Sequence, residues 1–311
     1  MPHPIPTIPT DKAWVITGPT SGIGYRTALE LGKRGTVVLV GRSPGKLEDV
    51  KREIESEGGH ATTVIADFSD VASVRKAAAA IAALGLPIRG VLNNAGIFPN
   101  RPSTNSLGWD NAYATNHLGP FAFTDALIPS LPDGANVVFI TSAAEDGERK
   151  IAVQAGFRGA RFISVEASAR GEWLSPGGSK LPGGDAYATS KQGPLVTALA
   201  FASAYPRLRF SAIEPGVTPG TNLGRDMNVV LRGVSSALGP VLQVLPHYTT
   251  PKKAARNIAN ILTGDATPTG VYFDENGKPM HGSKQAHDPA FQDSYVEQTR
   301  ALLATVPAAT D

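Results

Sequence analysis

Short apolar runs alternate with amphipathic stretches along most of this chain, and the alternation restricts the folds that it can adopt. Seven runs are short and rich in β-branched residues, as strands buried on both faces of a sheet tend to be: Ala13–Thr17, Thr36–Val40, Thr62–Ala66, Ile88–Leu92, Asn136–Thr141, Phe210–Ile213 and Gly270–Phe273. Helix-like stretches lie between them: Gly22–Arg34, Pro44–Glu57, Asp70–Leu84, Trp109–Leu127 and Tyr187–Ala204. This order predicts βαβ units and a doubly wound parallel sheet of seven strands with helices on both faces.

Composition excludes several classes of protein. Of the 311 residues, 41% are apolar and 18% are charged, which is typical of a soluble globular chain with a sizeable core. The net charge of +2 is too small to indicate nucleic-acid binding, and the absence of cysteine excludes disulfides and thiolate metal sites. No window is apolar for long enough to span a bilayer, and the proline-rich first ten residues do not resemble a secretory signal. We therefore predict a cytoplasmic protein that binds neither nucleic acid nor membranes, and the histidine spacing predicts no metal site.

The chain shows no internal repeat and no linker that would separate two domains. We predict a flexible arm at residues 1–11, one domain at residues 12–305 and a short tail at residues 306–311. Two long stretches interrupt the alternation. Residues 145–184 are rich in glycine, arginine and serine, and residues 222–250 contain a markedly apolar segment. Loops of this length in a compact domain are usually functional or disordered.

A glycine-rich turn joins the first strand to the first helix, in the run Thr17-Gly18-Pro19-Thr20-Ser21-Gly22-Ile23-Gly24. Such a turn places backbone N–H groups and the positive end of a helix against a pyrophosphate. The glycine spacing departs from the G-x-G-x-x-G pattern, and a lone glycine cluster can be a mere tight turn. We predict that the cofactor is bound by residues Gly18, Thr20, Ser21, Gly22, Ile23 and Gly24.

The residues after the second strand predict which dinucleotide is bound. An NAD enzyme usually carries an acidic residue at this place for the ribose 2′-hydroxyl, whereas an arginine accommodates a 2′-phosphate. Here Gly41 leaves no carboxylate, and Arg42 offers a planar fork of donors. The alternative is a solvated loop arginine. NADP(H) is the predicted cofactor.

Tyr187 and Lys191 stand four residues apart, which places them one turn apart on the same face of a helix. A free tyrosine has a pKa near ~10 and is a poor proton donor or acceptor at pH 7. A nearby cation favours the phenolate, so we expect Lys191 to lower the pKa of Tyr187 toward the working range. Taken alone, a tyrosine early in an amphipathic helix is ordinarily a packing residue.

With these residues in hand, the chain resembles the short-chain dehydrogenase/reductase superfamily in its single-domain TGxxxGIG/YxxxK branch, over roughly residues 12–273. The glycine turn and the Tyr187/Lys191 pair match two of the family's motifs, and the remaining matches follow in the family's order: Asp67 after the third strand, Asn93-Asn94-Ala95-Gly96, Asn116, Ser142 and Pro215-Gly216. The resemblance implies a Rossmann-like fold. It also implies that Asp67, Asn93, Ala95, Gly96, Pro215, Gly216 and Thr218 contact the cofactor, together with Tyr187 and Lys191.

The resemblance further implies a catalytic tetrad and an activity. Tyr187 would exchange a proton with the substrate oxygen, and Ser142 would hydrogen-bond that oxygen. Lys191 would lower the pKa of Tyr187 and bind the nicotinamide ribose, and Asn116 would hold a water that relays protons. The expected function is an NADP-dependent oxidoreductase that interconverts a ketone or aldehyde and its alcohol, acting as a reductase. The alternatives are an NADPH-dependent double-bond reductase and a non-catalytic NADP-binding sensor.

The stretch at residues 145–184 departs from the family pattern, because it separates Ser142 from Tyr187 by far more than the usual spacing. In this respect the chain is similar to monomeric carbonyl reductases and to protochlorophyllide reductases. In the carbonyl reductases the insert covers the helices that form the usual dimer face, which implies a monomer here and otherwise a homodimer. A competing expectation is that the insert lines the substrate mouth, where Phe157, Phe162 and Trp173 could contact an apolar ligand.

Two further details stay open at this point. Either Thr218 or Thr221 could be the family's threonine after Pro215-Gly216. The apolar segment within residues 222–250 occupies the place of the family's substrate lid, which would favour a bulky apolar carbonyl compound, but a buried pair of helices is an equal alternative.

Overall fold

The computed structural model describes residues 11–173, 183–218 and 247–307. Its strands form one sheet in the order β3-β2-β1-β4-β5-β6-β7-β8. Neighbouring strands from β3 to β7 pair in parallel, so the Rossmann-like, doubly wound fold predicted from the sequence is confirmed. The strand bounds are β1 Ala13–Thr17, β2 Thr36–Gly41, β3 His60–Ile65, β4 Ile88–Asn93, β5 Asn136–Ile140, β6 Arg209–Ile213, β7 Val271–Phe273 and β8 Pro279–Met280.

The sheet has eight strands, one more than the seven that the sequence predicted. After β7 the chain reverses in a turn in which the N–H of Asp274 donates to the carbonyl of Lys278 at 2.8 Å. The reversal lets β8 pair antiparallel with β7, with Met280 opposite Tyr272. A two-residue strand that begins with a proline has no alternating pattern, so the sequence carries no signal for it.

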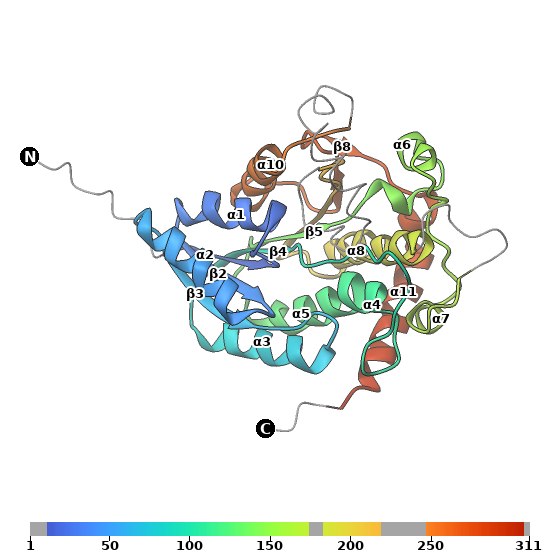
Figure 1. The fold of residues 1–311 in the computed structure, drawn as a ribbon, viewed down its shortest axis with the longest axis horizontal. Helices are drawn as coiled ribbons and strands as arrows, with labels where there is room; N and C mark the ends of the chain where they lie inside the picture. Colours follow the sequence, from blue (N-terminus) through green and yellow to red (C-terminus); the bar gives the residue numbers. More distant parts are fainter. Residues whose placement is uncertain (1–10, 174–182, 219–246, 308–311) are drawn as a thin grey trace, which may run out of the picture.

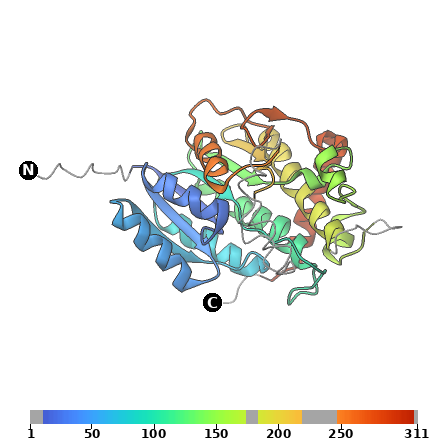
Figure 2. The same ribbon diagram turned by 45° about the horizontal axis from the view of Figure 1, so that its top comes forward.

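Helices cover both faces of the sheet, as Figures 1 and 2 show. One face carries α1 Gly22–Gly32, α2 Pro44–Ser56 and α10 Pro251–Thr263. The opposite face carries α3 Val71–Ala83, α5 Gly119–Leu127 and α8 Gly184–Ala204. Because side chains alternate along a strand, Val15 of β1 enters one core and its neighbour Ile16 enters the other.

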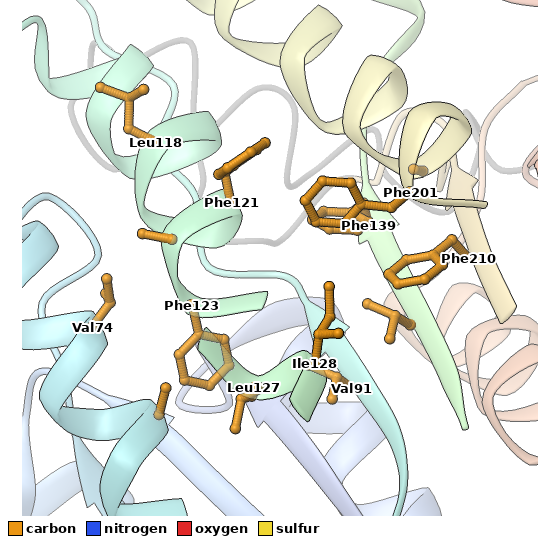
Figure 3. Packing of buried hydrophobic residues seen from close by; sticks show 14 of the residues in the cluster. Val74, Val91, Leu118, Phe121, Phe123, Leu127, Ile128, Phe139, Phe201 and Phe210 are labelled. Atoms are coloured by element: carbon orange, nitrogen blue, oxygen red, sulfur yellow. The ribbon is translucent and has the colours of Figure 1, made fainter. Parts of the chain in front are cut away.

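The larger core lies between the sheet and α3, α5 and α8 (Figure 3). Aromatic rings dominate it where α5 and α8 meet β5 and β6. Phe121 and Phe201 have ring centroids 5.1 Å apart, and the Phe201 ring packs edge-on against Phe210 at 5.6 Å. Burial of rings of this size supplies much of the apolar stabilisation that holds α8 against the sheet.

Strand order reverses between β1 and β4, which lie side by side at the centre of the sheet. The helices that follow these two strands lie on opposite faces, so the chain diverges at their carboxyl ends. In open α/β sheets, ligands bind in the crevice that this divergence leaves. The topology therefore places the glycine turn after β1 and the segment after β4 at one crevice.

The helix expected at residues 109–127 is interrupted. It consists of a short α4 at Asn111–Tyr113, a π-helical turn at Ala114–Leu118 and then α5. At its start the Asp110 carboxylate accepts the N–H of Tyr113 at 2.8 Å and caps the first turn. The π-helical turn contains Asn116, and turns of this kind occur often at functional sites.

The insert is only partly described, over residues 145–173 and 183–184. It forms two short helices, α6 Lys150–Gln154 and α7 Val165–Ala169. Helix α7 packs against the C-terminal helix α11 at Pro289–Ala304, which lies along α8. The sequence pattern did not predict α10 or α11.

Several sequence-based predictions lie outside the described residues. Most of the lid predicted at residues 222–250 belongs to them, as do Thr221, most of the N-terminal arm and part of the C-terminal tail. Within the part of the chain that is described, no helix is long and apolar enough to cross a bilayer.

Candidate active site

The carboxyl ends of β1 and β4 are tied together by two polar side chains. The hydroxyl of Thr17 accepts the N–H groups of Asn94 and Ala95, each at 2.9 Å. In return, the Asn94 amide donates to the carbonyls of Thr17 and Gly18 at 2.9 and 3.1 Å. The glycine turn and the segment after β4 therefore hold each other in place. Thr17 and Asn94 were not among the predicted site residues, although Asn94 stands inside the matched motif.

At two positions of the glycine turn, the backbone conformation or the distance to neighbouring atoms leaves room only for glycine. Gly18 has a φ of 64°, and a Cβ at Gly24 would lie 2.4 Å from both the Asn94 amide and the Gly18 carbonyl. Ser21 precedes α1 but makes no capping hydrogen bond with its side chain, and the first turn of α1 holds no acidic residue. The predicted residues Thr20, Ser21, Gly22 and Ile23 are all half-buried here. An uncapped helix start with glycines packed behind it fits a pyrophosphate.

Arg42 and Asp67 follow β2 and β3 at the same edge of the sheet. Arg42 is exposed directly after the last residue of β2, and no ion pair involves it among the described residues. Asp67 is half-buried and accepts both the N–H and the hydroxyl of Ser69, at 2.9 and 2.7 Å. Asn93 is buried and its amide donates to Thr124 at 2.9 Å, so its side chain braces α5 against the sheet.

Asn116 is fixed at every polar atom of its side chain. Its Oδ1 accepts the N–H of Ile97 at 2.8 Å, and its Nδ2 donates to the Ile97 carbonyl at 2.9 Å and to the Ser190 hydroxyl at 2.8 Å. The amide thus joins the segment after β4 to helix α8. A Cβ placed on Gly96 would lie 3.0 Å from Asn116 Oδ1 and 3.5 Å from Lys191 Nζ. Gly96 therefore lies close to both Asn116 and Lys191.

The Lys191 ammonium is almost completely buried, with 3% of the residue exposed. It donates to the carbonyl of Ile140, the last residue of β5, at 3.0 Å. The Lys191 carbonyl in turn accepts the hydroxyl of Thr141 at 2.7 Å, which anchors this turn of α8 to the end of β5. Burial lowers the pKa of Lys191 to about 8, because the charged form loses its hydration.

Tyr187 lies close to Ser142, whose hydroxyl is one of the groups that set the pKa of the phenol. Burial raises the pKa of Tyr187 to about 12, although the nearby Ser142 hydroxyl lowers it in part; the charge of Glu214 raises it further. The Lys191 ammonium lies 5.8 Å from the centroid of the Tyr187 ring. The expectation that Lys191 brings the phenol pKa toward neutrality is therefore wrong for this structure, because loss of hydration dominates at both groups. The phenol keeps its proton at neutral pH.

The segment after β6 turns sharply at Gly216, whose φ is 74°. A Cβ at this position would lie 2.7 Å from the carbonyl of His247. The N–H of Val217 donates to that carbonyl at 2.9 Å. The hydroxyl of Thr218 donates back to the carbonyl of Gly216 at 3.0 Å, so Thr218 closes its own turn. Pro215 is half-buried beside it.

Two buried carboxylates near the site were not predicted. Glu214 follows β6 and forms an ion pair of 3.6 Å with Arg149 of the insert. Burial raises the pKa of Glu214 to about 7, and Arg149 lowers it in part. Glu145 lies three residues after Ser142 and accepts the N–H of Ser283 at 3.0 Å, and burial raises its pKa also to about 7. A lone acidic residue after an apolar run gives no sequence signal of burial.

The three aromatic residues of the insert have different surroundings. Phe157 lies beside Tyr187, with ring centroids 6.1 Å apart. Phe162 instead packs on α11, with its ring centroid 5.2 Å from Phe291 and 5.0 Å from Tyr295. Trp173 is half-buried at the edge of the described segment. Only Phe157 of the three is in contact with the predicted tetrad.

The structure thus brings together a phenol, a hydroxyl and an ammonium at the carboxyl ends of the central strands, where the glycine turn also lies. A negative charge that grows on a carbonyl oxygen needs a positioned donor and a proton source. The arrangement can supply both from Ser142 and Tyr187. The donor set has no need of a metal for this chemistry.

Known proteins resemble the chain in sequence and in fold. The family described as short chain dehydrogenase matches residues 12–156. Dehydrogenase/reductase SDR family member 12 of Bos taurus is 28% identical over 300 residues, which are 92% of this chain and 84% of that protein. The structure of an uncharacterized protein from Mycobacterium paratuberculosis superposes with a TM-score of 0.68 at 26% identity. The match covers 97% of this chain and 96% of that protein's chain. A blue fluorescent protein from a metagenomic library, whose structure was solved with NADPH, gives a TM-score of 0.63 at 25% identity. The match covers 86% of this chain and 96% of that protein's chain.

Proposed function

Because the chain belongs to the short-chain dehydrogenase/reductase superfamily, we propose that it is an NADP-dependent reductase that converts a ketone or aldehyde into its alcohol. One observation supports this proposal more strongly than any other observation of the site. The phenol of Tyr187 is buried with the Lys191 ammonium 5.8 Å from its ring centroid, and burial raises its pKa to about 12, so that it holds its proton at neutral pH. Reduction of a carbonyl needs a proton donor in that protonation state.

The tetrad residues take separate roles in the proposed reaction. When bound in the crevice, NADPH supplies the hydride for the carbonyl carbon. Ser142 donates a hydrogen bond to the carbonyl oxygen, and Tyr187 gives that oxygen its proton. The Lys191 ammonium, 5.8 Å from the ring centroid, then stabilises the phenolate that is left. Asn116 positions α8 through Ser190 and the segment after β4 through Ile97.

Three observations support NADP over NAD. No carboxylate follows β2, since Gly41 ends the strand. Arg42 is exposed directly after it and can pair with a 2′-phosphate. The metagenomic blue fluorescent protein that shares this fold was solved with NADPH. We propose that Arg42 binds the 2′-phosphate and that the backbone N–H groups at the start of α1 bind the pyrophosphate.

Tyr187→Phe tests the proposed chemistry directly. The variant keeps the ring but has no proton to give, so we expect kcat for carbonyl reduction to fall by about 10²–10⁴. NADPH affinity is expected to change by no more than about tenfold, because at most one hydrogen bond is lost. The measurement is NADPH consumption against a panel of ketones and aldehydes, with NADPH binding measured by fluorescence.

Tyr205→Phe is the matched control, because the Tyr205 hydroxyl accepts a bond from Arg300 away from the tetrad. It is expected to retain near wild-type activity. Undiminished turnover by Tyr187→Phe would contradict the mechanism. Tight NADPH binding by the wild type without turnover of any carbonyl would instead favour a non-catalytic NADP-binding protein.

Arg42→Asp tests the cofactor assignment. The substitution removes the guanidinium and places a carboxylate where it can accept the ribose 2′-hydroxyl or repel a 2′-phosphate. We expect the ratio of kcat/KM for NADPH over NADH to fall by about tenfold to a hundredfold, as for the loss of a charge-assisted hydrogen bond. Lys46→Asp, on the exposed face of α2, makes the same charge change nearby and controls for net charge. An unchanged ratio in Arg42→Asp would place the phosphate contact elsewhere.

We also propose that the chain is a monomer. The resemblance implies that an insert at this place covers the helices that form the usual dimer face. In this chain α7 of the insert packs against α11, and α11 in turn contacts α8 and pairs Arg300 with Asp125 of α5 at 2.9 Å. Light scattering is expected to give the mass of one chain, and a stable tetramer would contradict the proposal.

A further inference from the structure

Two phenylalanines border the phenol of Tyr187. The Phe98 ring meets it edge-on with centroids 4.7 Å apart, and the Phe157 ring lies at 6.1 Å. The two phenylalanine rings are 6.0 Å from each other. With Ala144 and Ala188 they form a small apolar cluster that is separate from the two main cores. Phe98 and Phe157 are only half-buried in it, so each keeps part of its ring free for another contact.

Phe98 is held in place by the tetrad itself. Its neighbour Ile97 has both backbone polar groups bonded to the side chain of Asn116. The backbone that carries Phe98 is therefore fixed by the same amide that contacts α8. Sequence reasoning did not single out this residue, because an aromatic residue after a glycine motif is not a signal by itself.

Phe157 comes from the insert, and the segment that carries it is clamped to α8 on either side of Tyr187. Arg158 forms an ion pair of 2.7 Å with Asp185, two residues before Tyr187. The N–H of Arg161 donates to the hydroxyl of Thr189, two residues after it, at 2.8 Å. These contacts fix the distance between the Phe157 ring and the reacting phenol.

We propose that Phe98 and Phe157 form an aromatic wall that selects carbonyl compounds with an aromatic ring attached to the carbonyl, that is, aryl ketones and aryl aldehydes; this inference rests on the proposed reductase function. A carbonyl oxygen hydrogen-bonded to Tyr187 lies about 3 Å from the phenol oxygen, so a group attached to that carbonyl falls beside the two rings. Aromatic pairs in offset or edge-to-face contact gain affinity beyond the area that they bury.

The test compares two ketones that share one carbon skeleton: acetophenone, and cyclohexyl methyl ketone with the ring saturated. The quantity measured is the ratio of kcat/KM for the aryl over the saturated ketone, in each variant relative to wild type, so that intrinsic reactivity cancels. Phe157→Leu keeps an apolar side chain but loses the ring, and the ratio is expected to fall about twofold to tenfold. Phe157→Tyr keeps the ring and is expected to keep the ratio. A second matched pair, 1-tetralone and 1-decalone, repeats the comparison with fused rings.

Phe162→Leu is the matched control. It makes the same change in the same insert, but its ring packs on α11, so the ratio is expected to stay at the wild-type value. An unchanged ratio in a folded, NADPH-binding Phe157→Leu variant would overturn the aromatic wall while leaving carbonyl reduction intact. If the wild type reduces none of the four ketones, the proposed substrate class is contradicted. If it reduces no compound of a broad carbonyl panel, the proposed function is contradicted as well.

Discussion

Burial of a phenol and an ammonium one turn apart on α8 is the constraint on which the rest of the site depends. Removing both groups from water favours their neutral forms, which raises the pKa of Tyr187 and lowers that of Lys191. The surrounding structure compensates in part. The Ile140 carbonyl accepts from the Lys191 ammonium, and the Ser142 hydroxyl lowers the pKa of Tyr187 in part. The result is a Tyr187 phenol that holds its proton at neutral pH. The Lys191 ammonium lies near enough to stabilise the phenolate that a proton transfer would leave.

The fold brings these groups together through the ends of its central strands. The end of β5 supplies Ile140 and Ser142, and the segment after β4 holds Asn116 through Ile97. Asn116 reaches that segment because it stands in a π-helical turn, whose extra residue per turn shifts its side chain relative to a regular helix. The insert also contacts α8, because Arg158 pairs with Asp185 and the N–H of Arg161 donates to the hydroxyl of Thr189. Positioning of the tetrad is therefore shared among four separate stretches of the chain.

Much of the fold could be predicted because parallel strands buried on both faces leave apolar runs that the sequence shows plainly. The positions of β1 and β6 and the start of α1 follow from such runs and from the glycine turn. The second half of the chain could not be predicted as well, since α11 and β8 have no strong periodicity or turn chemistry. Within the site, spacing singled out Tyr187 and Lys191, whereas Asn116 and Ser142 were predicted from the resemblance to the family. The clamp of Arg158 on Asp185, the buried Glu214 and the tie between Thr17 and Asn94 depend on tertiary contacts, which spacing does not encode.

Direct titration of the Tyr187 phenol tests the central claim. Phenolate absorbs near 295 nm, and subtracting the signal of Tyr187→Phe from that of the wild type isolates this one residue among the seven tyrosines. The account predicts no phenolate from Tyr187 below about pH 10, because burial raises its pKa to about 12. A difference signal that rises between about pH 7 and 9 would contradict it, and would mean that the neighbouring ammonium outweighs the loss of hydration.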